Sequence, residues 1–219
     1  MARPRTPKGR ARRTHELLAG EYPDAECELD HQNPFQLLIA TILSAQATDV
    51  GVNKVTPGLF ARFGDADALA MADLEEVEGL ISSLGLFRNK AKSVVKCAGQ
   101  LVDRHDGEVP TSMKDLTALA GVGRKTANVV RSVALDLPGL PVDTHVLRLS
   151  GLLDLTTETD PVKVEMVLNP MIPASERGVF SLRMILHGRR VCIARRPRCG
   201  ECVLASYCPS VRADAGIPS

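Results

Sequence analysis

The sequence lacks the features that mark membrane, secreted and β-rich proteins. None of its 219 residues lie in an uncharged apolar run approaching roughly 18 residues, so we expect no membrane-spanning helix. The N-terminus has no apolar segment of the signal-peptide kind, which argues against secretion. No stretch alternates apolar and polar residues between hairpin turns. We therefore expect an all-α protein of the cytoplasm.

The chain also has little net charge and few aromatic residues. The net charge is +1, and there are two Tyr, five Phe and no Trp, whereas a nucleic-acid binder usually carries a strongly basic patch. Charge is nevertheless uneven: residues 1–13 carry six basic and no acidic side chains, and residues 177–219 carry eight basic against two acidic. Either the surface charge is simply blocky, or basic segments face a polyanion. Because residues 1–13 have Pro and Gly but no apolar period, we predict a disordered basic arm there.

Helix-start signals organise the rest of the chain. Asn33 followed by Pro34 predicts a capped helix start, and the run that follows is apolar on nearly every face, which is typical of a central buried helix. Asp73 and Glu76 predict a capping box. Further helices are expected over residues 14–20, 89–105, 112–120, 124–136 and 143–153, from Pro161, and from a Ser175 cap to His187. In the helix 89–105 we expect the basic side chains Lys90, Lys92 and Lys96 to face solvent.

A Gly-Val-Gly hairpin leads into a lysine. Gly121 and Gly123 flank Val122, which permits a tight turn and a close approach to another surface. The helix start that follows points unpaired N–H groups outward, and its dipole favours an anion and the neutral, nucleophilic form of a lysine amine. Lys125 lies in this first turn, and Asp143 follows 18 positions later at the predicted start of the next helix. This amine and carboxylate are our candidate active site.

Four cysteines close the chain in a C-x6-C-x2-C-x5-C pattern: Cys192, Cys199, Cys202 and Cys208. Four thiolates this close in sequence can hold a zinc ion or a [4Fe–4S] cluster. Zinc sites usually pair two C-x2-C units and only one is present, which favours the iron–sulfur cluster. The basic loop between the first two ligands presents Arg195, Arg196 and Arg198, as DNA contacts or as ordinary solvated charge. Cys27 and Cys97 are expected to be small buried thiols.

These motifs together resemble the endonuclease III branch of the helix-hairpin-helix DNA glycosylases. The resemblance runs from about Thr14 to Cys208. It is carried by LSAQATD at 43–49, LAGVGRKTA at 119–127, VDTH at 142–145, HGR at 187–189 and the four-cysteine pattern. It implies a base excision repair enzyme that removes oxidised pyrimidines from double-stranded DNA, forms a Schiff base through Lys125 and cuts the strand by β-elimination, with Asp143 as the catalytic carboxylate.

The resemblance also implies an architecture and further site residues. A six-helix domain over 28–139 and a [4Fe–4S] domain over 14–27 plus 140–219 would enclose a DNA cleft, in a monomer associated with the bacterial nucleoid. Ser44, Asp49 and His145 would line the base pocket or support it, with a satisfied interior role open for His145. DNA contacts are expected from Gln46, Leu86, Gly121, Val122, Gly123, Arg124, Arg148, Arg195, Arg196 and Arg198. For Leu86, packing against the core remains an alternative.

Two departures and two alternatives remain. The family usually has Pro before the first hairpin glycine, where this chain has Ala120, and the scarcity of aromatic residues argues against an aromatic sandwich for the flipped base. A monofunctional adenine glycosylase is disfavoured by Lys125 and by the short segment after Cys208. A non-catalytic iron–sulfur DNA-binding module would not need the pair of Lys125 and Asp143.

Overall fold

The computed structural model describes residues 4–211, and within them it is helical with no strand. The described residues form two compact units, each treated separately below: one combines the residues through Glu26 with those from Pro138 onward, and the other is Cys27–Leu137. The parts of the predicted 1–13 arm and 140–219 domain that fall on residues 1–3 and 212–219 lie outside the described residues. No described helix combines the length and apolar character needed to cross a bilayer.

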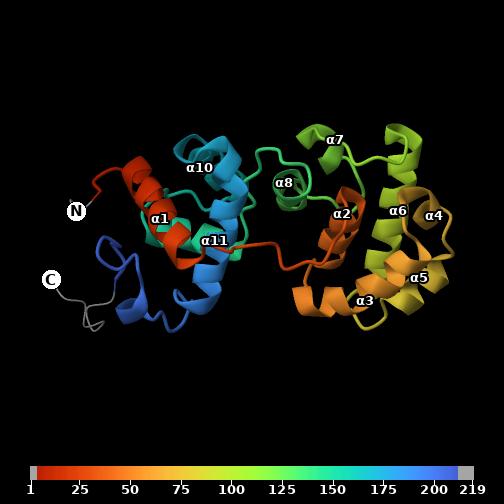
Figure 1. Cartoon of the computed structure of the whole chain (residues 1–219), viewed down its shortest axis with the longest axis horizontal. Helices are drawn as coiled ribbons and strands as arrows, with labels where there is room; N and C mark the ends of the chain where they lie inside the picture. The colour runs from red at the N-terminus through yellow and green to blue at the C-terminus, as the bar shows by residue number, and fades with distance from the viewer. Residues whose placement is uncertain (1–3, 212–219) are drawn as a thin grey trace. The chain divides into compact units, whose positions relative to one another are not determined.

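The unit Cys27–Leu137 is built around one apolar helix (Figure 1). Its seven helices, against the six expected, include two of only five residues: α2 (Pro34–Leu43), α3 (Asp49–Arg62), α4 (Ala66–Ala70), α5 (Leu74–Leu80), α6 (Phe87–His105), α7 (Met113–Thr117) and α8 (Arg124–Val133). Helix α2 buries eight of its ten residues and packs against α3, α6 and α8. Asn33 caps it as predicted, accepting from the Gln36 N–H at 2.9 Å, with Pro34 in the first turn.

The other unit joins the two ends of the chain. Its elements are α1 (Pro7–Glu21), α9 (Thr144–Leu152), α10 (Pro161–Leu168), η1 (Asn169–Met171), η2 (Ala174–Glu176), α11 (Arg177–Arg190) and η3 (Cys199–Glu201). Helix α11 packs against both α1 and α9, and its Phe180 and Met184 are fully buried. Helices α1 and α11 lie side by side in Figure 1. The N-terminal helix thus contributes Ala11 and Leu18 to the same core.

The predicted disordered arm is wrong for residues 7–13, which form the first turns of α1. Thr6 caps this helix by accepting from the Gly9 N–H at 3.1 Å. Arg10 donates from Nη2 to the Asp154 carboxylate at 2.6 Å, and Ala11 is fully buried. The apolar period was too short to detect within residues 1–13, because only Ala11 among them enters the core.

Other helix details also differ from expectation. Asp73 caps α5 by accepting from the Glu75 N–H at 3.3 Å, and Glu76 pairs with Arg62, so no capping box forms. Ser175 lies within η2, and α11 begins after Glu176 without a side-chain cap. Lys90 is buried, with 5% of its surface exposed, because its turn of α6 faces the core rather than solvent.

Candidate active-site and cluster-binding residues

The two hairpin glycines, Gly121 and Gly123, differ in why glycine is needed at each position. Gly121 has φ +76°, and a Cβ there would lie 2.9 Å from Ile42 Cγ2 and 3.1 Å from Ser93 Cβ. Glycine is therefore required at position 121 both by the left-handed backbone and by the close contact with α2 and α6. Gly123 has an extended backbone, and a Cβ there would meet nothing within 4 Å. Gly123 is the N-cap residue of α8, and no side chain caps this helix. Because glycine has no side chain, the N–H groups at the helix start are left open to a ligand.

Ala120, the departure from the usual proline, gives the hairpin an extra anchor. Its backbone N–H donates to Gln100 Oε1 on α6 at 2.7 Å. A proline would have no such N–H. The turn is therefore held at Ala120 by a hydrogen bond and at Gly121 by close packing.

Lys125 is the second residue of α8 and is exposed. It lies within electrostatic range of Cys27, as does Asp49. Burial raises the pKa of the Cys27 thiol, the Asp49 carboxylate adds to this rise, and the Lys125 ammonium opposes it. Cys27, expected to be a buried thiol, is only half-buried, whereas Cys97 is buried as expected.

The turn between α2 and α3 holds two predicted residues in a constrained backbone. Gln46 has φ 54°, and the Ser44 hydroxyl donates to the Thr41 carbonyl at 2.9 Å. Leu86, just before α6, has φ 58° and is 57% exposed. A left-handed leucine is unusual, and strained backbones of this kind cluster at functional sites. Its exposure excludes the alternative that Leu86 packs into the core.

Asp143 belongs to the other unit and caps α9. Its Oδ1 accepts from the backbone N–H groups of His145 at 2.8 Å and Val146 at 2.9 Å. These two bonds orient the carboxylate, and both leave Oδ2 available. His145 lies against α11, where a Cβ on Gly188 would come within 2.7 Å of its Nδ1. The VDTH and HGR motifs are therefore two sides of one packing contact.

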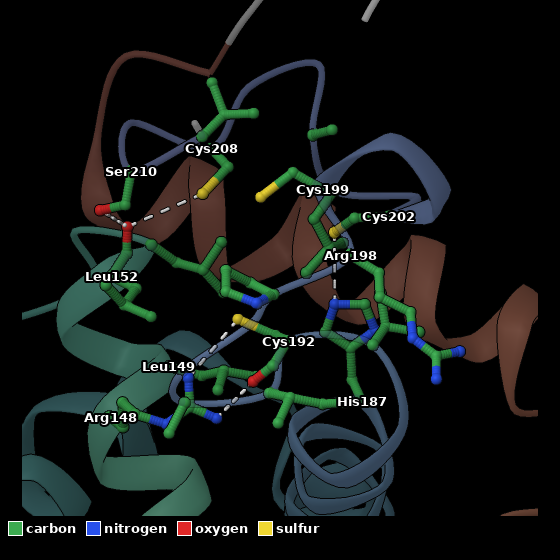
Figure 2. A pocket seen from close by; sticks show the side chains of 18 residues that line it. Arg148, Leu149, Leu152, His187, Cys192, Arg198, Cys199, Cys202, Cys208 and Ser210 are labelled. Atoms are coloured by element: carbon green, nitrogen blue, oxygen red, sulfur yellow. Dashed lines mark hydrogen bonds between the residues drawn. The ribbon is translucent and has the colours of Figure 1, made fainter. Parts of the chain in front are cut away.

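The four C-terminal cysteines line one cavity of about 170 Å³ (Figure 2). Burial, together with the negative charge of the other three cysteines, raises the pKa of Cys202 to about 11, although a backbone hydrogen bond opposes the shift. Among residues 4–211, however, no cluster of His, Cys, Asp or Glu is tight enough for a metal ion. Four cysteine thiols lining one cavity are the donor set that an iron–sulfur cluster takes.

Two polar side chains contact these cysteines. Arg148, which is also predicted to contact DNA, directs Nη1 to Cys192 Sγ at 3.6 Å and Nη2 to the Cys192 carbonyl. His187 Nε2 lies 3.3 Å from Cys202 Sγ (Figure 2). Burial, with a contribution from Arg148, lowers the pKa of His187 to about 4. The loop arginines Arg195, Arg196 and Arg198 are exposed, with Arg198 3.7 Å from Glu201.

Two family models match the chain. Residues 39–173 match the HhH-GPD superfamily base excision DNA repair protein, and residues 192–208 match the iron-sulfur binding domain of endonuclease III. The second match decides between the two metals left open above: the cofactor is an iron–sulfur cluster.

Curated relatives and solved structures agree with these matches. Endonuclease III of Synechocystis sp. is 54% identical over 90% of each chain, and that of Bacillus subtilis is 46% identical over 85% of this chain and 86% of the relative. A trapped endonuclease III–DNA covalent intermediate aligns with a TM-score of 0.87 and 45% identity, over 93% of this chain and 96% of the other. A thermostable thymine-DNA glycosylase, 18% identical, shares the fold over 92% of this chain and 96% of its own, with a TM-score of 0.84. Because family models, relatives and structures agree along most of its length, the chain belongs to the endonuclease III family of base excision DNA repair proteins.

Proposed function

We propose that Lys125 is the nucleophile of this chain, a DNA glycosylase and AP lyase of base excision repair. The observation that carries the proposal is the position of Lys125: it is exposed in the first turn of α8, directly after the anchored hairpin. A helix start without a side-chain cap can bind the phosphate beside a flipped nucleotide, which brings the lysine to the sugar. The related covalent endonuclease III–DNA intermediate supports a covalent route.

The proposed chemistry has two stages. The Lys125 nitrogen bonds to C1′ of the sugar as the bond from C1′ to the base breaks, and the base leaves with the electron pair and gains a proton. The sugar ring then opens at C1′ to give an imine with Lys125. Loss of the C2′ proton next to this imine expels the 3′ phosphate and cuts the strand.

Asp143 is proposed to serve both stages. Its Oδ1 is held by the α9 N–H groups of His145 and Val146, so Oδ2 can take the proton released by the lysine amine. The same negative charge stabilises the positive charge that develops on the sugar as the base departs. Asn at this position would still cap α9 but could not accept that proton.

Other predicted residues have supporting roles in the proposal. Gly121, Val122 and Gly123 bind a phosphate, with Arg124 beside them. Gln46 and Leu86 occupy the gap that the flipped nucleotide leaves, and Ser44, Asp49 and His145 surround the base. Arg195, Arg196 and Arg198 meet the DNA backbone, because all three are exposed on the loop between two cysteines. We propose oxidised pyrimidines in double-stranded DNA as substrates, for a monomer associated with the nucleoid.

Cys192, Cys199, Cys202 and Cys208 would hold the iron–sulfur cluster. When bound, the cluster supplies a one-electron redox couple and cross-links the loop. The protein's own contribution is to order the arginine loop, since a pinned loop loses less conformational entropy on meeting DNA. Loss of one of these four cysteines is therefore expected to weaken DNA binding as well as to bleach the protein.

Borohydride trapping tests the proposed nucleophile. The protein is incubated with a duplex containing an abasic site, and borohydride reduces any imine to a stable adduct. Wild type and Lys54→Ala, which removes an exposed lysine of α3, should form the adduct, and Lys125→Ala should not. Asp143→Asn should bind the duplex but remove bases about 100-fold more slowly. An adduct of undiminished yield in Lys125→Ala would rule out the proposed nucleophile.

A further inference from the structure

A chain of polar side chains connects the N-terminal helix to the cysteine cavity. Tyr22, the residue at the C-terminal end of α1, places its hydroxyl 3.2 Å from Nδ1 of His187. The other ring nitrogen of His187, Nε2, lies 3.3 Å from Cys202 Sγ. His187 is 1% exposed and Tyr22 is 7% exposed, so water does not compete for these contacts. Both nitrogens of the imidazole are therefore committed to protein partners.

Cluster binding decides which nitrogen carries the proton. A cysteine that binds iron is a thiolate and has no proton to donate, so His187 Nε2–H must donate to Cys202 Sγ. A neutral imidazole has one N–H, and Nδ1 then has to accept from the Tyr22 hydroxyl. Burial raises the pKa of Tyr22, which keeps that hydroxyl protonated and able to donate. A free Cys202 thiol would also permit the reverse arrangement, in which the sulfur donates to Nε2 and Nδ1–H donates to Tyr22.

We propose that Tyr22 and His187 set the reduction potential of the iron–sulfur cluster through the hydrogen bond to Cys202. In the loaded protein, one-electron reduction would increase the negative charge on the cysteine sulfurs, and no proton would need to move. A donor on Cys202 stabilises that added charge and raises the potential. The Tyr22 hydroxyl strengthens the donor, because a hydrogen bond accepted at Nδ1 polarises the Nε2–H group. These are positioning residues for the cluster, and the proposal does not depend on Lys125 or Asp143.

A purely structural role is the competing explanation. Tyr22 also holds α1 against α11. The rings of Tyr22 and His187 meet edge-on with their centroids 6.1 Å apart, and Arg190 Cζ lies 5.8 Å from the centroid of the Tyr22 ring. The Tyr22 carbonyl accepts from Arg183 Nε at 3.1 Å. All three contacts survive when only the hydroxyl is removed. Tyr22→Phe therefore separates the hydrogen-bond chain from the packing.

Tyr207 offers a matched control. Its hydroxyl is also buried between α1 and the cluster segment, and it exchanges a hydrogen bond with Thr14 Oγ1 at 2.8 Å. Tyr207→Phe thus removes one buried hydroxyl from the same interface without touching the contact to Cys202. Any shift in potential caused by general loosening of α1 should appear in both variants.

The test is voltammetry of the cluster-loaded protein on an electrode, which supplies the electron. Tyr22→Phe should lower the reduction potential by at least about 28 mV, which corresponds to a threefold change in the one-electron equilibrium constant. Tyr207→Phe should leave the potential unchanged. His187→Gln, which keeps an N–H donor near Nε2, should lie closer to wild type than His187→Met. Nitrogen-15 NMR of the loaded protein should show the proton on Nε2 of His187.

Three results would overturn the proposal: an unchanged potential in Tyr22→Phe, an equal shift in Tyr207→Phe, or a proton on Nδ1 in the loaded protein. Borohydride trapping of the same variants keeps this outcome separate from the proposed catalytic function. Tyr22→Phe should form the adduct normally whatever its potential.

Discussion

Replacing each hairpin glycine by alanine should separate folding from DNA binding. Gly121→Ala should destabilise the fold, whereas Gly123→Ala should weaken DNA binding and leave the fold intact. In Gly121→Ala the new Cβ would lie 2.9 Å from Ile42 Cγ2 and 3.1 Å from Ser93 Cβ, at φ +76°. The left-handed backbone costs an L-residue roughly 1–2 kcal/mol, and forcing a methyl into a packed contact costs about 1–3 kcal/mol. We therefore expect Gly121→Ala to lower the free energy of unfolding by about 2–5 kcal/mol.

Gly123→Ala is the internal control, because its Cβ would meet nothing within 4 Å and its backbone is extended. Its stability should be unchanged or about 0.5 kcal/mol higher, since alanine restricts the unfolded chain. The methyl would nevertheless stand at the start of α8, where we propose a phosphate, so DNA affinity should fall about tenfold.

Urea unfolding followed by circular dichroism measures the stability, and fluorescence anisotropy with a labelled duplex measures the affinity. The visible absorbance of the cluster checks that the cysteine segment is intact in every variant. The reasoning fails if Gly121→Ala unfolds within about 0.5 kcal/mol of wild type, or if Gly123→Ala loses as much stability as Gly121→Ala.

Four further predictions follow from single residues. Lys90→Met should raise the free energy of unfolding by about 1 kcal/mol, because the Lys90 amine is buried with no partner in the part of the chain described. Lys92→Met, at an exposed position of the same helix, should leave the stability unchanged. A lower free energy of unfolding for Lys90→Met in urea would contradict the reasoning. Leu86→Gly should stay within about 1 kcal/mol of wild type, because lost strain offsets added chain entropy, while base removal measured by gel assay falls about tenfold; full activity would count against a wedge. Burial raises the pKa of Cys97 from 9.0 to about 12, so the unfolded thiol loses its proton first. The stability of wild type relative to Cys97→Ala should then decrease as pH rises from 9 towards 12, and a constant difference in pH-dependent unfolding would refute it. Arg196→Ala should weaken binding to all duplexes alike and reduce the slope of log affinity against log salt by about one; an unchanged slope would remove Arg196 from the interface.

Local signals predicted the elements that depend on neighbouring residues. The Asn33 cap followed by Pro34 is confirmed, as is the helix predicted from Pro161, because a helix start depends on residues a few positions apart. The apolar run of α2 likewise predicted its burial. Helix α3, with Pro57 inside it, was not predicted, since proline normally argues against a helix interior.

Local patterns were less informative wherever a distant element decided the outcome. The basic residues 7–13 were predicted to be disordered, because their partners, α11 and Asp154, lie far away in the sequence. Lys90 read as a surface residue because charge usually marks an exposed face, yet the packing of α6 buries it. The contact of Arg148 with Cys192 was not predicted, because it spans 44 positions of sequence.

By itself, the sequence determined the helical class, the family, the hairpin with its lysine, and the four cysteines with their cofactor. These features are written in residue type and short spacing, and the chemistry of glycine, lysine and cysteine is the same in any context. Only the tertiary structure decided that Tyr22 reaches His187, that His187 reaches Cys202, and that Gly188 makes room for His145. Burial and hydrogen bonding are properties of surfaces brought together by folding, and partners such as Tyr22 and His187 lie 165 positions apart along the chain.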